Sequence, residues 1–451
     1  MTYTQHASAL LALGLPLVGS AVAGFLIHMT DTILLGWYDV ISLAAATIAT
    51  SFWFITFIVG AGFGNAVAPM VAGAVAAGDL TRARRVTRMA LWLSLAYGFV
   101  AVAILWNAEA IFLAIGQTPD VAAEGQRFLR IAVWGMFPAL AVNVLRNYLS
   151  AQHLTSVQLW VTVAAIFANA GLAYALIFGH FGLPELGIRG AAIGSVIIQS
   201  LTLLALAIYA DWRLPEAALF QRIWRSDNEA LRDVFRLGLP IGLTSLAESS
   251  LFTASAVMMG WIGEYPLAAH GIALQLTALM FMFHVGMSQA ATVRAGGAYG
   301  RRDEDELKRI AKTALAVSFS FGFFAVLLFV LAPEPLVVLF LDPEEPARDI
   351  IVPLGVTLMF MAALFQFVDA AQIVALSLLR GVQDTTVPMW LAIISYWVIG
   401  FPASYLFAFT FGFGPAGLWL GLTTGLGCAA GLLMWRFWGR SVRIGQGSVV
   451  V

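Results

Sequence analysis

The 451-residue sequence is far more apolar than a soluble domain, since 61% of its residues are hydrophobic, 11% are charged and the mean hydropathy is +0.88. The formal net charge of −1, with basic residues scattered over short loops, excludes a nucleic-acid-binding surface. The single cysteine, Cys428, excludes an intramolecular disulfide and a cysteine-rich metal site. We therefore expect an integral membrane protein that has the lipid bilayer, and no nucleic acid, as its partner.

The apolar stretches predict twelve transmembrane helices, because a hydrocarbon core of about 30 Å takes roughly 20 apolar residues per helix. The first stretch follows an N-terminus without Lys or Arg and is too long for the apolar core of a signal peptide, so we interpret it as a membrane helix. The predicted class is thus an all-α membrane protein. Its predicted spans are 9–36, 44–76, 85–107, 122–150, 155–180, 187–211, 234–262, 266–298, 306–332, 347–379, 386–411 and 415–437.

Basic residues indicate the orientation of these helices, because Lys and Arg are concentrated in short cytoplasmic loops. With the N-terminus inside, all but Arg127, Arg130, Arg189 and Arg348 of the 24 Lys and Arg residues fall on the cytoplasmic side. A missed or extra helix would destroy this asymmetry. The sequence therefore predicts an even number of spans with both termini in the cytoplasm.

The second half of the sequence repeats the first. Gly14-Leu-Pro16 opens the first predicted helix, and Gly238-Leu-Pro240 opens the seventh, 224 residues later. Leu145-Arg146 recurs as Leu379-Arg380, and both arginines are counted above as cytoplasmic. Six helices per repeat give both halves the same topology, with substrate sites expected at or near the repeat interface. We predict two pseudo-symmetric six-helix lobes, 1–212 and 234–451, joined by a cytoplasmic linker at 213–233.

Three carboxylates lie inside the predicted spans: Asp31, Glu248 and Asp369. An acid near a helix centre opposes membrane insertion by about 2.5–3.5 kcal/mol, so such a residue is by default functional. Burial favours the protonated form of a carboxyl group, whereas a neighbouring cation favours the ionised form. A group that holds a proton, a sodium ion or a cationic substrate, one at a time, is what an antiporter requires. The sequence therefore predicts a coupled transporter, and it contains no HExxH or GxSxG motif of an enzyme.

Each acid has polar or aromatic companions on its own helical face. Phe365, Gln366 and Gln372 accompany Asp369, Ser245 lies one turn before Glu248, and His28 lies one turn before Asp31. Oxygen ligands suit a hard cation such as Na⁺, and a ring face suits an organic cation. The alternative that stays open is a structural acid, bonded to a Ser, Trp or His of a neighbouring helix.

Four stretches of the chain match a known family in order and spacing. They are Asp31-Thr-Ile-Leu-Leu-Gly36 with 44–49 after it, 240–248, 369–381 and 178–187. Together they resemble the multidrug and toxic compound extrusion (MATE) transporters, most closely the bacterial NorM-type branch, over essentially the whole chain. The resemblance implies a V-shaped pair of lobes in the bacterial cytoplasmic (inner) membrane. It further implies a monomer that exports cationic amphipathic compounds by alternating access, in exchange for Na⁺ or H⁺ and without a cofactor.

The resemblance assigns Glu248 and Asp369 to a cation site and Asp31 to a cavity of the N-terminal lobe, and the companion residues extend both sites. The expected cation site comprises Glu248, Asp369, Phe365, Gln366 and Ser245, with Na⁺ or H⁺ at the two acids. The expected protonation and substrate-binding residues are Asp31, His28, Asn169, Gln275 and Gln372. Two positions depart from the family pattern: Phe365 stands where a tyrosine is frequent, and Ala173 replaces one of two asparagines.

A lipid-linked saccharide flippase of the same superfamily is the alternative function. Such a protein would bind an anionic pyrophosphate and should carry arginines inside its spans. The sequence places acids there instead, which favours the antiporter.

Overall fold

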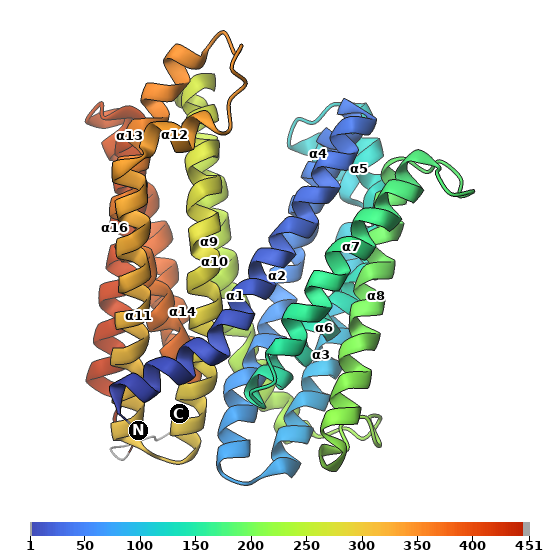
Figure 1. Ribbon diagram of the computed structural model, residues 1–451, viewed down its shortest axis with the longest axis vertical. Coiled ribbons are helices and arrows are strands. Elements are labelled where there is room, and N and C mark those ends of the chain that lie inside the picture. Colours follow the sequence, from blue (N-terminus) through green and yellow to red (C-terminus); the bar gives the residue numbers. More distant parts are fainter. Residues whose placement is uncertain (1, 445–451) are drawn as a thin grey trace. The chain divides into compact units, whose positions relative to one another are not determined.

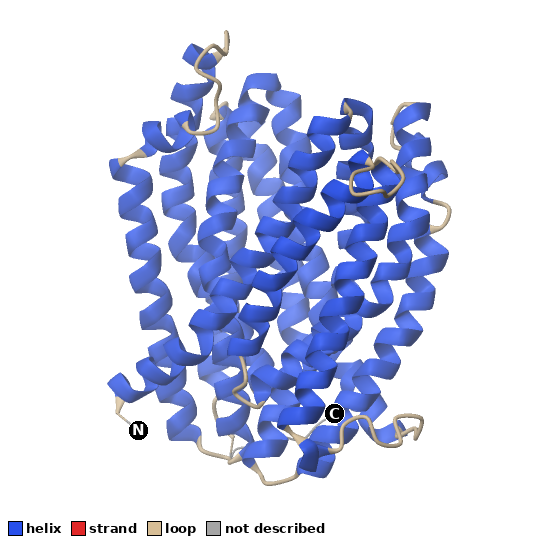
Figure 2. Ribbon diagram, turned by 45° about the vertical axis from the view of Figure 1, so that its right-hand side comes forward, coloured by secondary structure: helices blue, strands red, loops and turns tan. Residues whose placement is uncertain are grey.

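The computed structural model describes residues 2–444 and contains twelve helices that are long and apolar enough to cross a membrane. Figure 2 shows helices joined by loops, and no strand occurs in the described part of the chain. The predicted all-α class and the twelve spans are therefore confirmed. The spanning helices are α1 (Tyr3–Tyr38), α2 (Val40–Ala76), α3 (Leu80–Leu105), α5 and α6 (Pro119–Ala132 and Met136–Ala151), α7 (Ser156–Phe178), α8 (Ile188–Arg213), α9 (Asn228–Ile262), α10 (Glu264–Gly300), α11 (Glu304–Leu331), α13 (Arg348–Gly381), α14 and α15 (Thr386–Ile393 and Phe401–Tyr405, with π-helical turns after each) and α16 (Gly414–Arg436).

Aspartate caps fix where two of these helices begin. The side chain of Asp79 accepts a hydrogen bond from the backbone N–H of Arg82 (2.8 Å), and Asp303 accepts one from Glu306 (2.8 Å). Such N-caps satisfy backbone donors that have no partner within the helix. Helix α3 therefore starts at Leu80 and not at the predicted residue 85, and its basic residues lie on its first turns. The two caps are 224 residues apart, the spacing of the sequence repeat.

Two short helices escaped prediction from the sequence. Helix α4 (Ala108–Ala114) follows the third span, and α12 (Pro333–Val338) follows the ninth. Both are too short to cross a bilayer, so a search for long apolar stretches cannot find them. Their matched places in the chain support the two-repeat organisation.

Packing divides the chain into two compact units (Figure 1). The N-terminal unit is Gly19–Gly242, and the C-terminal unit comprises the residues up to Val18 and those from Leu243 onward. Both divisions fall two residues after a helix proline, Pro16 in α1 and Pro240 in α9. Each unit thus includes the start of the other repeat's first helix. The predicted lobe boundaries at 212 and 234 stay a prediction.

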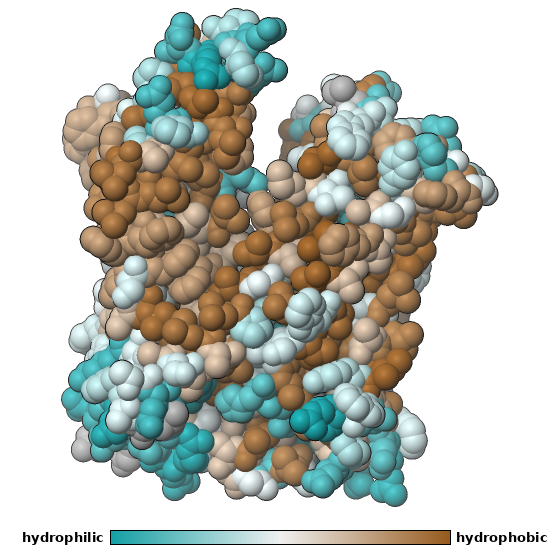
Figure 3. Space-filling view, viewed as in Figure 1, coloured by the Kyte–Doolittle hydropathy of each residue, from teal (hydrophilic) through white to brown (hydrophobic). Residues whose placement is uncertain are grey.

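The surface of the helices is patterned as expected for a protein surrounded by lipid. Figure 3 shows apolar side chains over the middle of the helices and polar side chains gathered at their ends. Many large apolar residues are exposed along the spans, among them Phe99, Phe167 and Leu204. In water such a surface would be a liability, whereas in a bilayer it is solvated by lipid tails. The chain is therefore a multi-pass membrane protein.

Small residues allow close helix contacts in the C-terminal unit. A Cβ atom added to Gly421 on α16 would lie 2.2 Å from the backbone N of Ser404 on α15. Close approach of backbones at glycine is a common way to pack membrane helices.

Pro402 lies in α15, and the helix widens to π-helical turns on both sides, over Ile394–Gly400 and Leu406–Thr410. A proline has no N–H to donate, and π-turns of this kind occur frequently at functional sites.

Gly421→Ala is expected to lower the thermal unfolding midpoint of the detergent-purified protein, because the new methyl group would push α16 away from α15. Gly431→Ala is the matched control on the same helix, since a Cβ there meets no atom within 4 Å. Alanine favours a helix by up to about 1 kcal/mol over glycine, so Gly431→Ala should unfold at the same temperature or higher. Equal midpoints for the two variants would contradict the close contact.

The region predicted as a linker is bound to the N-terminal unit. Buried Arg88 on α3 donates hydrogen bonds to the backbone carbonyls of Leu219 and Ala218 (2.7 Å each). Arg85 forms an ion pair and a hydrogen bond with Asp227, directly before α9. This hydrogen bond holds the pKa of Asp227 below its usual value. The basic start of α3 therefore binds both the linker and the start of α9.

Asp227→Asn should therefore destabilise the protein in a pH-dependent way. Because the folded-state pKa of Asp227 is lowered, its stabilising contribution is present above the unfolded-state pKa and is lost as the pH falls through the folded-state pKa. At pH 7 the variant should lose about 1 kcal/mol or less of unfolding free energy, and near pH 3 the difference from wild type should shrink. Unfolding midpoints at both pH values test this, with Glu216→Gln, an exposed loop acid, as the control. A difference that is unchanged at pH 3 would contradict the ion pair.

Candidate functional site

A cavity of about 630 Å³ lies within the N-terminal unit, between α1, α2, α5, α6, α7 and α8. Aromatic rings form one part of its lining, including Trp53, Phe54 and Phe57. Aliphatic residues form much of the rest, and polar side chains lie among them, including Asn143, Arg146, Gln199 and Thr202. A largely apolar cavity with a few converging polar groups is the usual form of a small-molecule site.

Asp31 is the acid of this cavity. Its carboxylate accepts a hydrogen bond from Nδ2 of Asn169 on α7 (2.7 Å) and interacts with Ser195 on α8. Asn169 is only 1% exposed, so its amide is fixed by the surrounding helices. His28, one turn before Asp31, lines the same cavity. The structure therefore brings together three residues expected to act in protonation and substrate binding: Asp31, His28 and Asn169.

Arg146 contradicts one expectation from the sequence. It was counted with the cytoplasmic basic residues, and the spans were expected to contain acids in place of arginines. In the structure Arg146 lines the cavity from α6, where its guanidinium donates a hydrogen bond to the hydroxyl of Thr162 (2.9 Å). Its Nε is buried and has no hydrogen-bond partner within residues 2–444. The cavity thus carries a cationic group as well as an acidic one.

The C-terminal unit contains the other two acids. Asp369 on α13 is 2% exposed, and it interacts electrostatically with Glu248 on α9. Arg380, at the end of α13, also acts on Glu248, and Gln372 interacts with the same carboxyl group. The structure therefore brings Glu248 and Asp369 together, with one guanidinium nearby. Two neighbouring carboxylates repel each other unless a proton or a cation lies between them.

Two glutamines beside these acids have unused oxygen atoms. Gln366 and Gln372 are completely buried on α13. Nε2 of Gln372 donates a hydrogen bond to the hydroxyl of Tyr396, whereas Oε1 of Gln372 and both amide atoms of Gln366 have no partner in the described structure. A buried polar atom without a partner costs about 1–3 kcal/mol. These amide oxygens are therefore ready to bind a ligand.

Aromatic rings complete this cluster. The ring of Phe365 contacts Phe252 and Trp419 edge to face, with centroid distances of 6.0 and 5.8 Å. The indole N–H of Trp419 donates to Nδ1 of His270 (3.0 Å), and both residues are buried. Phe365 thus supplies a ring face and no oxygen, while the nearby hydroxyl belongs to Tyr396.

Tyr396, Arg380 and Trp419 were missed by reasoning from the sequence. Tyr396 and Trp419 lie on other helices that become neighbours of α13 only on folding, whereas Arg380 lies on α13 itself, about three helical turns after Asp369. For Tyr396 the one local signal is Pro402, because the π-helical segment that contains Tyr396 ends directly before that helix turn.

The remaining predicted residues are not all placed together. Ser245 is partly buried on α9, one turn before Glu248. Gln372 lies with Glu248 in the C-terminal unit, whereas Asp31 belongs to the N-terminal unit. Gln275 is exposed on α10 and does not line the cavity of the N-terminal unit. The predicted protonation and substrate-binding set is thus divided between the two units.

Gly24 shows how differently the repeats use one position. It lies 224 residues before Glu248 and so takes the equivalent place in α1. It lines the cavity of the N-terminal unit, and a Cβ added to it would meet no atom within 4 Å. The C-terminal repeat therefore has a carboxylate where the N-terminal repeat has open space.

Twelve spans in two repeats, a cavity with converging polar groups, and acids within the spans define a class, the multi-pass membrane transporters. The family model MatE matches residues 16–175 and 240–406, two stretches that begin at Pro16 and Pro240. The chain belongs to this family of MATE transporters and to its NorM-like branch. It is 45% identical over 439 residues to the "Probable multidrug resistance protein NorM" of Rhizobium meliloti, covering 97% of this chain and 94% of that protein. The protein of the same name from Agrobacterium fabrum is 43% identical over 438 residues, with the same coverage.

Solved structures share the fold. An outward-facing multidrug resistance MATE family transporter superposes with a TM-score of 0.87 at 22% identity, covering 98% of this chain and 97% of that one. The eukaryotic MATE transporter AtDTX14 gives 0.84 at 19% identity, covering 98% and 99%. A transporter of the wider MOP superfamily from Pyrococcus furiosus, described as having a binding pocket of reversed polarity, gives 0.87 at 21% identity, covering 98% and 97%. At these identities the likeness establishes the fold alone.

Asn169→Ala is expected to destabilise the N-terminal unit, because it removes the hydrogen bond to Asp31 and opens a gap at a buried position. The loss should be about 1 kcal/mol of unfolding free energy, seen as a lower thermal midpoint. Gln199→Ala is the matched control, since Gln199 lines the same cavity without a hydrogen bond to Asp31. If both variants unfold at the wild-type temperature, the Asp31–Asn169 bond does not contribute to stability.

Proposed function

We propose that the protein is a multidrug efflux antiporter of the bacterial cytoplasmic membrane, which exports cationic amphipathic compounds in exchange for Na⁺ or H⁺. Transport would proceed by alternating access, in a monomer and without a cofactor. The names of the NorM relatives support the class of cargo. Membership of the MATE family supports transport, and not catalysis, as the activity.

The observation that carries the coupling is the pair of acids in the C-terminal unit. Glu248 and Asp369 interact electrostatically, and buried amide oxygens of Gln366 and Gln372 lack partners beside them. Carboxylate and amide oxygens are suitable ligands for a hard cation such as Na⁺. Binding of Na⁺ or H⁺ would relieve the repulsion between the two carboxylates.

Asp31 would perform the corresponding step in the N-terminal unit. Its carboxylate lines the cavity together with His28 and several aromatic rings. A negative group beside ring faces suits an organic cation, which a ring attracts through its negative face. Protonation of Asp31 would remove that negative charge and so release the cargo. The ion and the cargo would then exclude each other, as exchange requires.

Arg146 keeps the lipid-linked saccharide flippase as a second candidate. An arginine in the cavity, with an Nε that has no partner in the described structure, could bind an anionic group of a lipid-linked sugar. Asp31 and the acid pair of the C-terminal unit favour the antiporter, because a flippase of an anionic lipid has no use for three acids. Efflux of a cationic dye distinguishes the two functions.

Proteoliposomes that contain the purified protein should expel ethidium when a Na⁺ gradient or a pH gradient is imposed. Glu248→Gln and Asp369→Asn should each lower the gradient-driven rate at least about tenfold, since loss of a charged ligand at a buried site costs 1.4 kcal/mol or more of binding free energy. The initial rate of change in dye fluorescence measures the effect. We expect Asp31→Asn to lower the pH-driven rate.

Matched controls are exposed acids on the same unit. They are Glu264→Gln and Asp349→Asn. Glu264 lies at the start of α10, and Asp349 lies at the start of α13, the helix of Asp369. Both should transport like wild type. Efflux that neither gradient drives would reject coupled antiport, and full activity of the Glu248 and Asp369 variants would reject the proposed ion site.

A further inference from the structure

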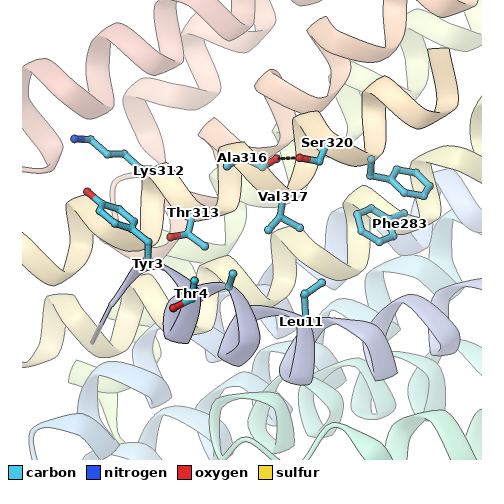
Figure 4. Close-up of a pocket in the computed structure, with 11 residues that line it drawn as sticks. Tyr3, Thr4, Leu11, Phe283, Lys312, Thr313, Ala316, Val317 and Ser320 are labelled. Atoms are coloured by element: carbon cyan, nitrogen blue, oxygen red, sulfur yellow. Dashed lines mark hydrogen bonds between the residues drawn. The ribbon is translucent and has the colours of Figure 1, made fainter. Parts of the chain in front are cut away.

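A second hollow, the α1–α11 groove, opens on the surface of the C-terminal unit. Its volume is about 770 Å³, and it lies between the start of α1 and the facing side of α11, with Phe283 of α10 at one end (Figure 4). The α1 side presents residues from Tyr3 to Leu11, and the α11 side presents residues from Lys312 to Phe321. Eight residues of helix correspond to about 12 Å, so the groove is elongated. None of the acids proposed for transport lines it.

One end of the groove is polar and cationic. Figure 4 shows Tyr3 and Lys312 at the same end, with Thr4 and Thr313 beside them. Lys312 is exposed and forms no ion pair within residues 2–444. Its neighbour one turn earlier, Lys308, is bound to Glu304 (2.6 Å). A lysine without a counter-ion at the edge of an apolar groove is suited to bind an anionic group.

The other end of the groove is apolar. Phe283 lies at this end (Figure 4), and its ring stacks on the ring of Phe321 with a centroid distance of 3.8 Å. Leu11 and Val317 form its walls at this end. Ala7 and Ala316 also line the groove, and their methyl side chains leave space between α1 and α11. A groove with a cation at one end and apolar side chains at the other complements a phospholipid, in which an anionic headgroup is joined to an acyl chain.

We propose that the α1–α11 groove is a binding site for one anionic phospholipid of the bilayer. Its phosphate binds the ammonium of Lys312 and its acyl chain lies between α1 and α11 against Phe283. On the predicted orientation the Lys312 end faces the cytoplasmic leaflet, whose anionic lipids attract lysine and arginine near the surface. Bound lipid would join the start of α1 to α11 and so hold that half-helix on the C-terminal unit. This inference does not depend on the proposed antiport activity.

The test uses the full-length protein in detergent, titrated with dioleoyl phosphatidylglycerol or with dioleoyl phosphatidylcholine. Native mass spectrometry counts the lipids retained at each concentration. One phosphatidylglycerol should be retained at a concentration where phosphatidylcholine is not. Lys312→Gln should weaken this retention about fivefold, the effect of one lysine near an anionic headgroup. Ala316→Phe should abolish it by filling the groove.

Lys308→Gln is the matched control, because it removes a cation from the same helix one turn away from the groove and should leave retention unchanged. Equal retention of the two lipids would overturn the proposal, as would equal effects of Lys312→Gln and Lys308→Gln. Full retention by a folded Ala316→Phe variant would also overturn it, since the lipid would then lie elsewhere. If Ala316→Phe does not fold, Ala316→Leu replaces it, and the Lys312→Gln result decides on its own whether the cation binds the headgroup.

Discussion

An ionisable side chain inside a bilayer must be surrounded by protein, because hydrocarbon offers it neither water nor a counter-ion. This constraint explains why the polar chemistry of the chain lies inside two compact units with apolar exteriors. Asp31 is held by Asn169 from a neighbouring helix, and Glu248 is accompanied by Asp369, Gln372 and Arg380. In each case several helices contribute partners. The surroundings of each acid, on which the proposed transport depends, are therefore set by the packing of the helices.

Features encoded in local sequence were predictable, and features created by tertiary packing were not. Runs of apolar residues located all twelve spans, since each span is a property of one continuous segment. The acids stood out for the same reason, because a charge within an apolar run is visible in the sequence. Tyr396 is an ordinary aromatic residue until α14 and α15 place its hydroxyl beside Gln372. Arg146 was expected on the cytoplasmic side because it stands near the end of its predicted span, and hydropathy does not tell toward which neighbouring helices a side chain points.

The first helix of each repeat also connects the two compact units. The boundary between the two compact units falls within a long helix in each repeat, shortly after a proline: after Val18 in α1 and after Gly242 in α9. A single helix that belongs to two units connects them covalently at its middle, where a proline has already removed one backbone hydrogen bond. The segment predicted as a linker is bound to α3 through Arg88 and Arg85. The chain therefore passes from one unit to the other inside two helices, and not through the segment predicted as a linker.

Gly24 and Glu248 illustrate what a duplicated fold can gain from losing its symmetry. At equivalent positions one repeat keeps a hydrogen atom and the other carries a carboxylate. Volume and charge compete for the same place in a helix bundle, because a side chain that binds an ion also fills the space that a bulky organic molecule would need. Two repeats remove this conflict, since at this position one repeat can provide cavity volume and the other a charge.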